Sequence, residues 1–157
     1  MKQTPQERIL VGRMAPGVLC REGFLGPDAR PLGEILDTDN STVVGLDLTH
    51  ERIAARLGAV LRRAVAALGT PVSVGEGLTA VHHEAMGRIP CPWGRCGTFA
   101  KGEVELADDL TGRTLRFTAL SVHQIAEHGF YQGRGSRYRL DPAELWAALN
   151  RLADPRE

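Results

Sequence analysis

The sequence lacks a long hydrophobic segment. No apolar run approaches the roughly 18 to 20 residues that a membrane-spanning helix requires. The first residues, MKQTPQERILVGRM, also lack the continuous apolar stretch of a secretion signal. We therefore expect a cytoplasmic protein without a membrane partner.

Cysteine is scarce, and neither sign of charge is in excess. The chain has three cysteines, and an odd number in a reducing compartment favours metal ligands or buried thiols over a disulfide framework. The net charge is zero, which argues against a protein that simply coats nucleic acid. No serine–histidine–acid arrangement or P-loop is present, so no specific enzyme class is indicated and a non-enzymatic role is favoured.

Length and composition are those of an ordinary globular protein. Hydrophobic residues make up 43% of the 157 residues and charged residues 24%, a balance that allows a buried core without disulfides. We expect a single domain over residues 1–157. Within it, residues 1–70 are predicted to be mainly helical, and residues 71–157 to form a β-hairpin and zinc-like part with a C-terminal helix.

Periodic apolar residues predict the main elements. Residues 50–68 carry an apolar stripe at helical spacing, with Thr49 as cap and a glycine and a proline after the end. Two alternating segments around DDLTG predict a β-hairpin. Thr118 or Ser121 can start the next helix, and Asp141 caps the last one. The sequence thus predicts an α+β fold: a helical N-terminal half, then a small antiparallel sheet with flanking helices.

Two cysteines and two histidines have the spacing of metal ligands. Cys91 and Cys96 flank four residues in the turn-rich stretch CPWGRC, and His123 and His128 are also separated by four residues. A regular helix would place these histidines about 140° apart, which opposes a shared ion. However, His128 immediately precedes Gly129, where the helix is predicted to end. The alternative is that the thiols are small buried residues and the imidazoles make ordinary hydrogen bonds.

This ligand order, with a hairpin between the pairs, resembles the ββα arrangement of two-cysteine, two-histidine zinc fingers. The resemblance covers roughly residues 88–131, and no whole-chain family is recognised. It implies tetrahedral zinc bound by the four side chains, in a closed structural site. One departure is clear, because 26 residues separate Cys96 from His123 where the family has about a dozen, so the hairpin must be longer or lie elsewhere.

The loop YQGRGSRYR predicts a basic contact surface. It combines Arg134, Arg137 and Arg139 with aromatic rings and glycines, which suit phosphate groups and bases. A nucleic acid or another phosphate-bearing ligand is the predicted partner. The alternative is a structural connector whose arginines pair with acidic residues of the first half, within one chain or across a homodimer.

The residues also allow two other functions. A metal-dependent hydrolase would use an open site near His83, Cys91 and His123, with Glu84 or Glu127 as base. A metal-free protein could instead form a homodimer through its acidic and basic ends. The cognate ligand, the pathway and the oligomeric state do not follow from the sequence.

Overall fold

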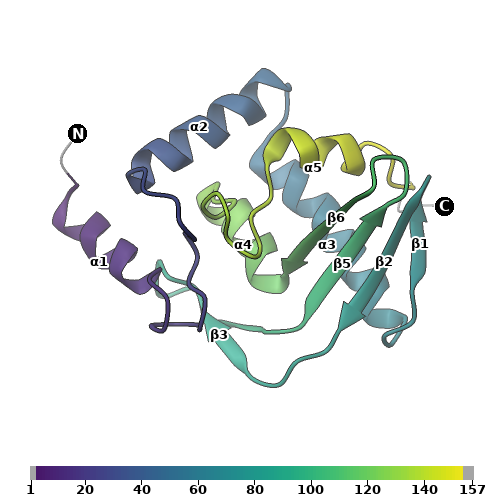
Figure 1. Cartoon of the computed structure of the whole chain (residues 1–157), viewed down its shortest axis with the longest axis horizontal. Helices are drawn as coiled ribbons and strands as arrows, with labels where there is room; N and C mark the ends of the chain where they lie inside the picture. The colour runs from purple at the N-terminus through teal and green to yellow at the C-terminus, as the bar shows by residue number, and fades with distance from the viewer. Residues whose placement is uncertain (1–2, 154–157) are drawn as a thin grey trace.

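The computed structural model describes residues 3–153 and confirms the predicted α+β fold (Figure 1). Three helices come first, followed by six strands and two more helices. Their bounds are α1 Pro5–Arg13, α2 Leu32–Gly45, α3 His50–Ala66, β1 Val72–Gly75, β2 Leu78–His83, β3 Arg88–Pro90, β4 Thr98–Ala100, β5 Glu103–Asp108, β6 Arg113–Thr118, α4 Ala119–His128 and α5 Pro142–Leu149. Among the described helices, none is long and apolar enough to cross a membrane.

The strands form one main sheet and one separate hairpin. The sheet has the order β1-β2-β5-β6, and every neighbouring pair is antiparallel. The predicted hairpin around DDLTG is β5 and β6. Strands β3 and β4 leave this sheet between β2 and β5 and pair only with each other. The chain therefore carries a small hairpin away from the main sheet, toward α1 (Figure 1).

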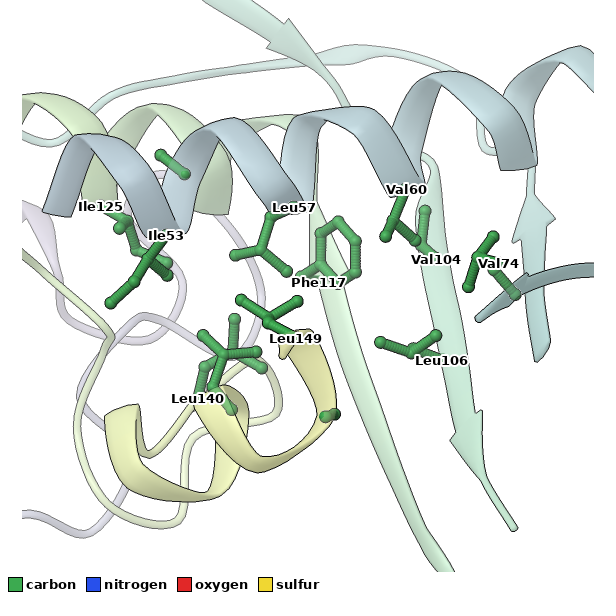
Figure 2. Packing of buried hydrophobic residues seen from close by; sticks show 14 of the residues in the cluster. Ile53, Leu57, Val60, Val74, Val104, Leu106, Phe117, Ile125, Leu140 and Leu149 are labelled. Atoms are coloured by element: carbon green, nitrogen blue, oxygen red, sulfur yellow. The ribbon is translucent and has the colours of Figure 1, made fainter. Parts of the chain in front are cut away.

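One face of the sheet is covered by helix α3, whose apolar stripe points toward the strands (Figure 2). Thr49 caps α3 by accepting a hydrogen bond from the amide of Arg52, as the sequence predicts. Helices α4 and α5 add side chains to the same cluster. Its labelled members in Figure 2 are Ile53, Leu57, Val60, Val74, Val104, Leu106, Phe117, Ile125, Leu140 and Leu149.

A second apolar cluster joins the N-terminal segment to the small hairpin. Its buried members are Met14, Phe24, Leu32, Ile35, Ile89, Cys91, Leu120 and Phe130. These residues come from α1 to α2, from β3 and its loop, and from α4 and the loop after it. The cluster lies outside the main core, so the packing of the small hairpin depends on this contact with α4 and the N-terminal segment.

The loop after α4 is tied to the N-terminal half by ionic contacts. The guanidinium of Arg139 contacts the carboxylate of Asp39 on α2 at 2.5 and 2.9 Å, and both side chains are nearly buried. The amide of Arg134 donates to Asp28 at 3.0 Å. The pairing of Arg139 with Asp39 agrees with the alternative in which arginines of this loop contact acidic residues of the first half within one chain. Arg139 therefore holds the fold together as well as carrying charge.

We predict that Arg139→Ala lowers the free energy of unfolding by about 3 kcal/mol, because it leaves the Asp39 carboxylate buried without its partner. Arg134→Ala is the matched control in the same loop. Its side chain is exposed and makes no ion pair within residues 3–153, so we expect a change within about 0.5 kcal/mol. Urea unfolding of both variants measures the difference. Equal stabilities of the two variants would contradict the structural role of Arg139.

We also predict an acid-sensitive contribution from Asp28. Hydrogen bonds from the Arg30 side chain hold the pKa of the Asp28 carboxyl well below its usual range. A carboxyl with a lowered pKa in the folded state stabilises the fold above the ordinary aspartate pKa of about 3.9 and loses this contribution as pH falls further. The stability difference between wild type and Asp28→Asn should therefore be constant near neutral pH and shrink below about pH 4. Urea unfolding as a function of pH tests this, and a pH-independent difference would count against it.

Candidate metal centre

The two cysteines lie on the turn of the small hairpin. Cys91 directly follows β3, and Cys96 precedes β4. Between them the backbone turns sharply through Gly94 and Arg95, which have φ values of 77° and 59°. The guanidinium of Arg13 on α1 donates to the carbonyl of Pro92 at 3.1 Å and ties this turn to the N-terminal helix. The turn therefore holds both thiols on the same side of the hairpin end.

The two histidines come from helix α4, which starts without a loop after β6. Thr118 ends the strand and caps the helix by accepting a hydrogen bond from the amide of Ser121 at 3.2 Å. His128 is the last helical residue, and Gly129 follows in the left-handed conformation with φ 59°. The imidazole rings meet edge to face, with centroids 5.3 Å apart. The 140° separation expected from a regular helix thus does not keep them apart.

The predicted four side chains come together. One ligand atom from each of Cys91, Cys96, His123 and His128 lies within 4.8 Å of the others. The Nε2 atom of His128 is 3.5 Å from the sulfur of Cys91 and 3.7 Å from that of Cys96. Metal bonds of about 2.3 Å to sulfur and about 2.0 Å to nitrogen, at a tetrahedral angle, place the two atoms about 3.5 Å apart. The cluster therefore has the dimensions of a tetrahedral metal site.

Aromatic rings enclose the cluster and desolvate it. Trp93 stacks on His128 with centroids 4.1 Å apart, and Phe99 lies 4.6 Å from the ring of His123. Burial raises the pKa of the Cys91 thiol to about 11 and lowers the pKa of both imidazoles below the usual range. The imidazoles are therefore neutral at pH 7, as metal ligation requires. A bound cation reverses the effect on the thiol, because it favours the thiolate.

One nitrogen of the cluster is buried without a partner. Among the described residues, His123 Nε2 has neither solvent contact nor a hydrogen bond. A buried polar atom without a partner costs about 1 to 3 kcal/mol. A metal ion bound to this nitrogen would remove this cost. The unpartnered nitrogen therefore supports a cation at this set of two sulfurs and two nitrogens, and this support does not depend on the spacing in the sequence.

Other residues considered from the sequence lie outside the cluster. His83 contacts Glu105 at 3.6 Å on the main sheet, so it does not replace Cys96 as a ligand. Arg137 pairs with Glu103 at 3.0 Å, and Arg139 pairs with Asp39. Arg134 is exposed. The three arginines thus do not form a single free cationic surface, and their role in binding a nucleic acid or another anion stays a prediction.

No protein-family model, curated protein or solved structure matches the chain. The likeness to ββα zinc fingers is therefore limited to the ligand set and to its carriers, a hairpin turn and a helix. The extra residues between Cys96 and His123 have a structural explanation. They contain β4 and the whole β5–β6 hairpin of the main sheet, which stand between the two halves of the cluster.

The aromatic residues that contact the two imidazoles, Trp93 and Phe99, are not predicted from the sequence. Trp93 lies inside the stretch CPWGRC, and its position between the two cysteines was the available signal. Phe99 is on β4, and its contact with His123 depends on the way the hairpin packs against α4. Only the tertiary structure brings this ring to the cluster.

We predict that metal binding changes the tryptophan fluorescence through Trp93, because this indole stacks directly on His128. The other tryptophan, Trp146, lies on α5 near the guanidinium groups of Arg52 and Arg56 and serves as the control. Titration of chelator-treated protein with Zn²⁺ should change the emission of Trp146→Phe as in wild type. The change should disappear in Trp93→Phe, and its persistence there would place the responding metal elsewhere.

Proposed function

We propose that the protein is a small zinc-binding module, in which Cys91, Cys96, His123 and His128 hold one structural Zn²⁺. The observation that carries this proposal is the convergence of four ligand atoms within 4.8 Å, at separations close to those of a tetrahedral site. A mixed set of thiolates and imidazoles favours zinc over calcium or magnesium, which prefer oxygen ligands.

Four protein ligands support a structural role for the ion. A catalytic zinc keeps one position for water or substrate, whereas a closed tetrahedral shell does not. Glu127, one of the two bases considered for a hydrolase, is exposed, and Glu84 is exposed beyond the end of β2. The proposed ion instead joins the turn of the β3–β4 hairpin to α4. Structural zinc contributes about 10 kcal/mol or more at neutral pH to chains that are unfolded without it. Here the main core contains none of the four ligands, so we expect a smaller contribution.

The role of such a module is to present a binding surface, and we propose an anionic partner. Arg137 supports this, because its side chain remains 47% exposed although it contacts Glu103. Arg139 anchors the loop that carries Arg137 to helix α2 through its ion pair with Asp39. The homodimer alternative receives less support, since Arg139 and Asp39 satisfy each other within one chain.

Elemental analysis of the untagged protein tests the metal assignment. We expect one zinc per chain in wild type and loss of the metal in Cys91→Ala and His128→Ala, because three ligands bind more weakly than four. Cys20→Ala and His83→Ala are matched controls, since neither residue belongs to the cluster. Both controls should keep the zinc.

Two further measurements separate a lost ligand from a misfolded variant. Chelation of wild type should lower its thermal stability, because the proposed ion is part of the fold. Replacement of zinc by Co²⁺ should give the intense visible absorption of a tetrahedral site with thiolate ligands. Metal-free protein with the same stability before and after chelation would overturn the proposal in favour of the metal-free alternative.

A further inference from the structure

A cavity of about 240 Å³ lies beside the arginine loop. It is bounded by the segment between α1 and α2, by β3, by the junction of β6 and α4, and by the loop after α4. Figure 1 shows the first of these segments running close to β3 and α4. The cavity is slightly smaller than the roughly 300 Å³ at which pockets for drug-sized ligands begin. Its volume therefore suits a small organic molecule.

The inner part of the cavity is apolar. Phe24, Ile89 and Leu120 line it, and each has at most 8% of its surface exposed. All three belong to the second apolar cluster, so the floor of the cavity is firmly packed. An apolar floor favours a ligand with a hydrocarbon or aromatic body, because it removes that surface from water.

The rim of the cavity is mainly cationic. Arg21, Lys101 and Arg137 line it together with one acid, Glu22. Lys101 makes no ion pair with any carboxylate in the part of the chain that the structure describes. Arg137 is partly neutralised by Glu103, which also accepts a hydrogen bond from Tyr138 at 2.7 Å. These contacts fix the direction of the Arg137 guanidinium, whereas Lys101 and Arg21 have no ion-pair partner among the described residues.

A buried amide completes the polar side of the cavity. Gln132 is 3% exposed and lines the cavity, and its backbone has a φ of 68°, which is unusual for a residue other than glycine. Its Oε1 accepts a hydrogen bond from Ser136 at 2.6 Å, so the side-chain NH₂ group is the remaining donor. Strained backbone of this kind concentrates at ligand sites.

The wall that carries Gln132 is held rigidly before any ligand arrives. Gly133 donates its amide to the carbonyl of Phe24 at 3.0 Å, and a side chain at position 133 would collide with Leu25. The loop is thus in close backbone contact with the N-terminal segment. A wall held in this way lowers the ordering cost of binding.

We propose that this cavity binds a small organic anion, a carboxylate or a phosphate monoester with an apolar body. The body lies on Phe24, Ile89 and Leu120, and the anionic group contacts Lys101 and Arg137. The inference names a ligand class for the anionic partner of the proposed function. None of the four proposed metal ligands lines the cavity, so metal content and ligand binding are measured at different residues and can fail separately.

Amide chemical shifts of the ¹⁵N-labelled, metal-loaded full chain test the proposal. Benzoate and phenyl phosphate are the two probes, and they distinguish a carboxylate from a phosphate ligand. Benzyl alcohol is the neutral control, and inorganic phosphate lacks the apolar body. We expect one or both organic anions to shift the amide signals of Phe24, Gln132 and Tyr138, and to bind more tightly than either control.

Variants assign the binding to the rim. Lys101→Gln and Arg137→Gln should each weaken binding of the organic anion about tenfold, the loss expected for one charge-assisted contact. Arg134→Gln removes an exposed charge from the same loop but does not line the cavity, so its affinity should equal that of wild type. Lys101 is exposed and follows β4, so its variant tests the proposal even if Arg137→Gln disturbs the loop.

Three results would overturn the proposal. The first is that neither organic anion shifts the amide signals around the cavity. The second is that benzyl alcohol or inorganic phosphate binds as tightly as both organic anions. The third is an equal loss of affinity in Arg134→Gln and the two rim variants, which would indicate diffuse attraction by the basic loop instead of a defined site.

Discussion

The direct junction between β6 and α4 is the constraint on which the candidate metal centre depends. Thr118 belongs to the strand and also caps the helix, so no loop separates the main sheet from the imidazoles. The sheet thereby fixes the start of α4 and the position of His123. The thiols reach the same point by a different route, on a hairpin that leaves the sheet between β2 and β5. The cluster therefore forms where helix α4, which follows β6 directly, meets the β3–β4 hairpin.

Much of the fold follows from local signals in the sequence. Thr49, Asp141 and Gly129 cap or end the helices that the apolar periodicity predicts, and β5 and β6 alternate as a half-buried hairpin should. These features depend on neighbouring residues alone. The separate hairpin of β3 and β4 is harder to predict from the sequence, because strands of three residues show almost no periodicity. Its packing against α4 is a tertiary property.

The types and spacing of Cys91, Cys96, His123 and His128 identify them as candidate metal ligands, but the geometry between them does not follow from the sequence. A regular helix places His123 and His128 about 140° apart, which opposes a shared ion. Only the position of His128 at the helix end favours one. The arginine loop shows the opposite case. Its composition allows either a free basic surface or a connector whose arginines pair with acidic residues of the first half, and Arg139 pairs with Asp39, a hundred positions earlier in the chain. Local composition does not show which acidic residue the arginine contacts.

The interposed β5–β6 hairpin has a consequence for the order of folding. His128 lies 37 positions from Cys91 and 32 from Cys96. In a short finger, a metal can nucleate structure because its ligands are near neighbours on an otherwise unfolded chain. Here 26 residues with their own strands separate Cys96 from His123, so the ligand pairs meet only when the β3–β4 hairpin packs against α4. We expect the main sheet to form first, and an ion bound at the candidate centre would then stabilise a protein whose fold is nearly complete.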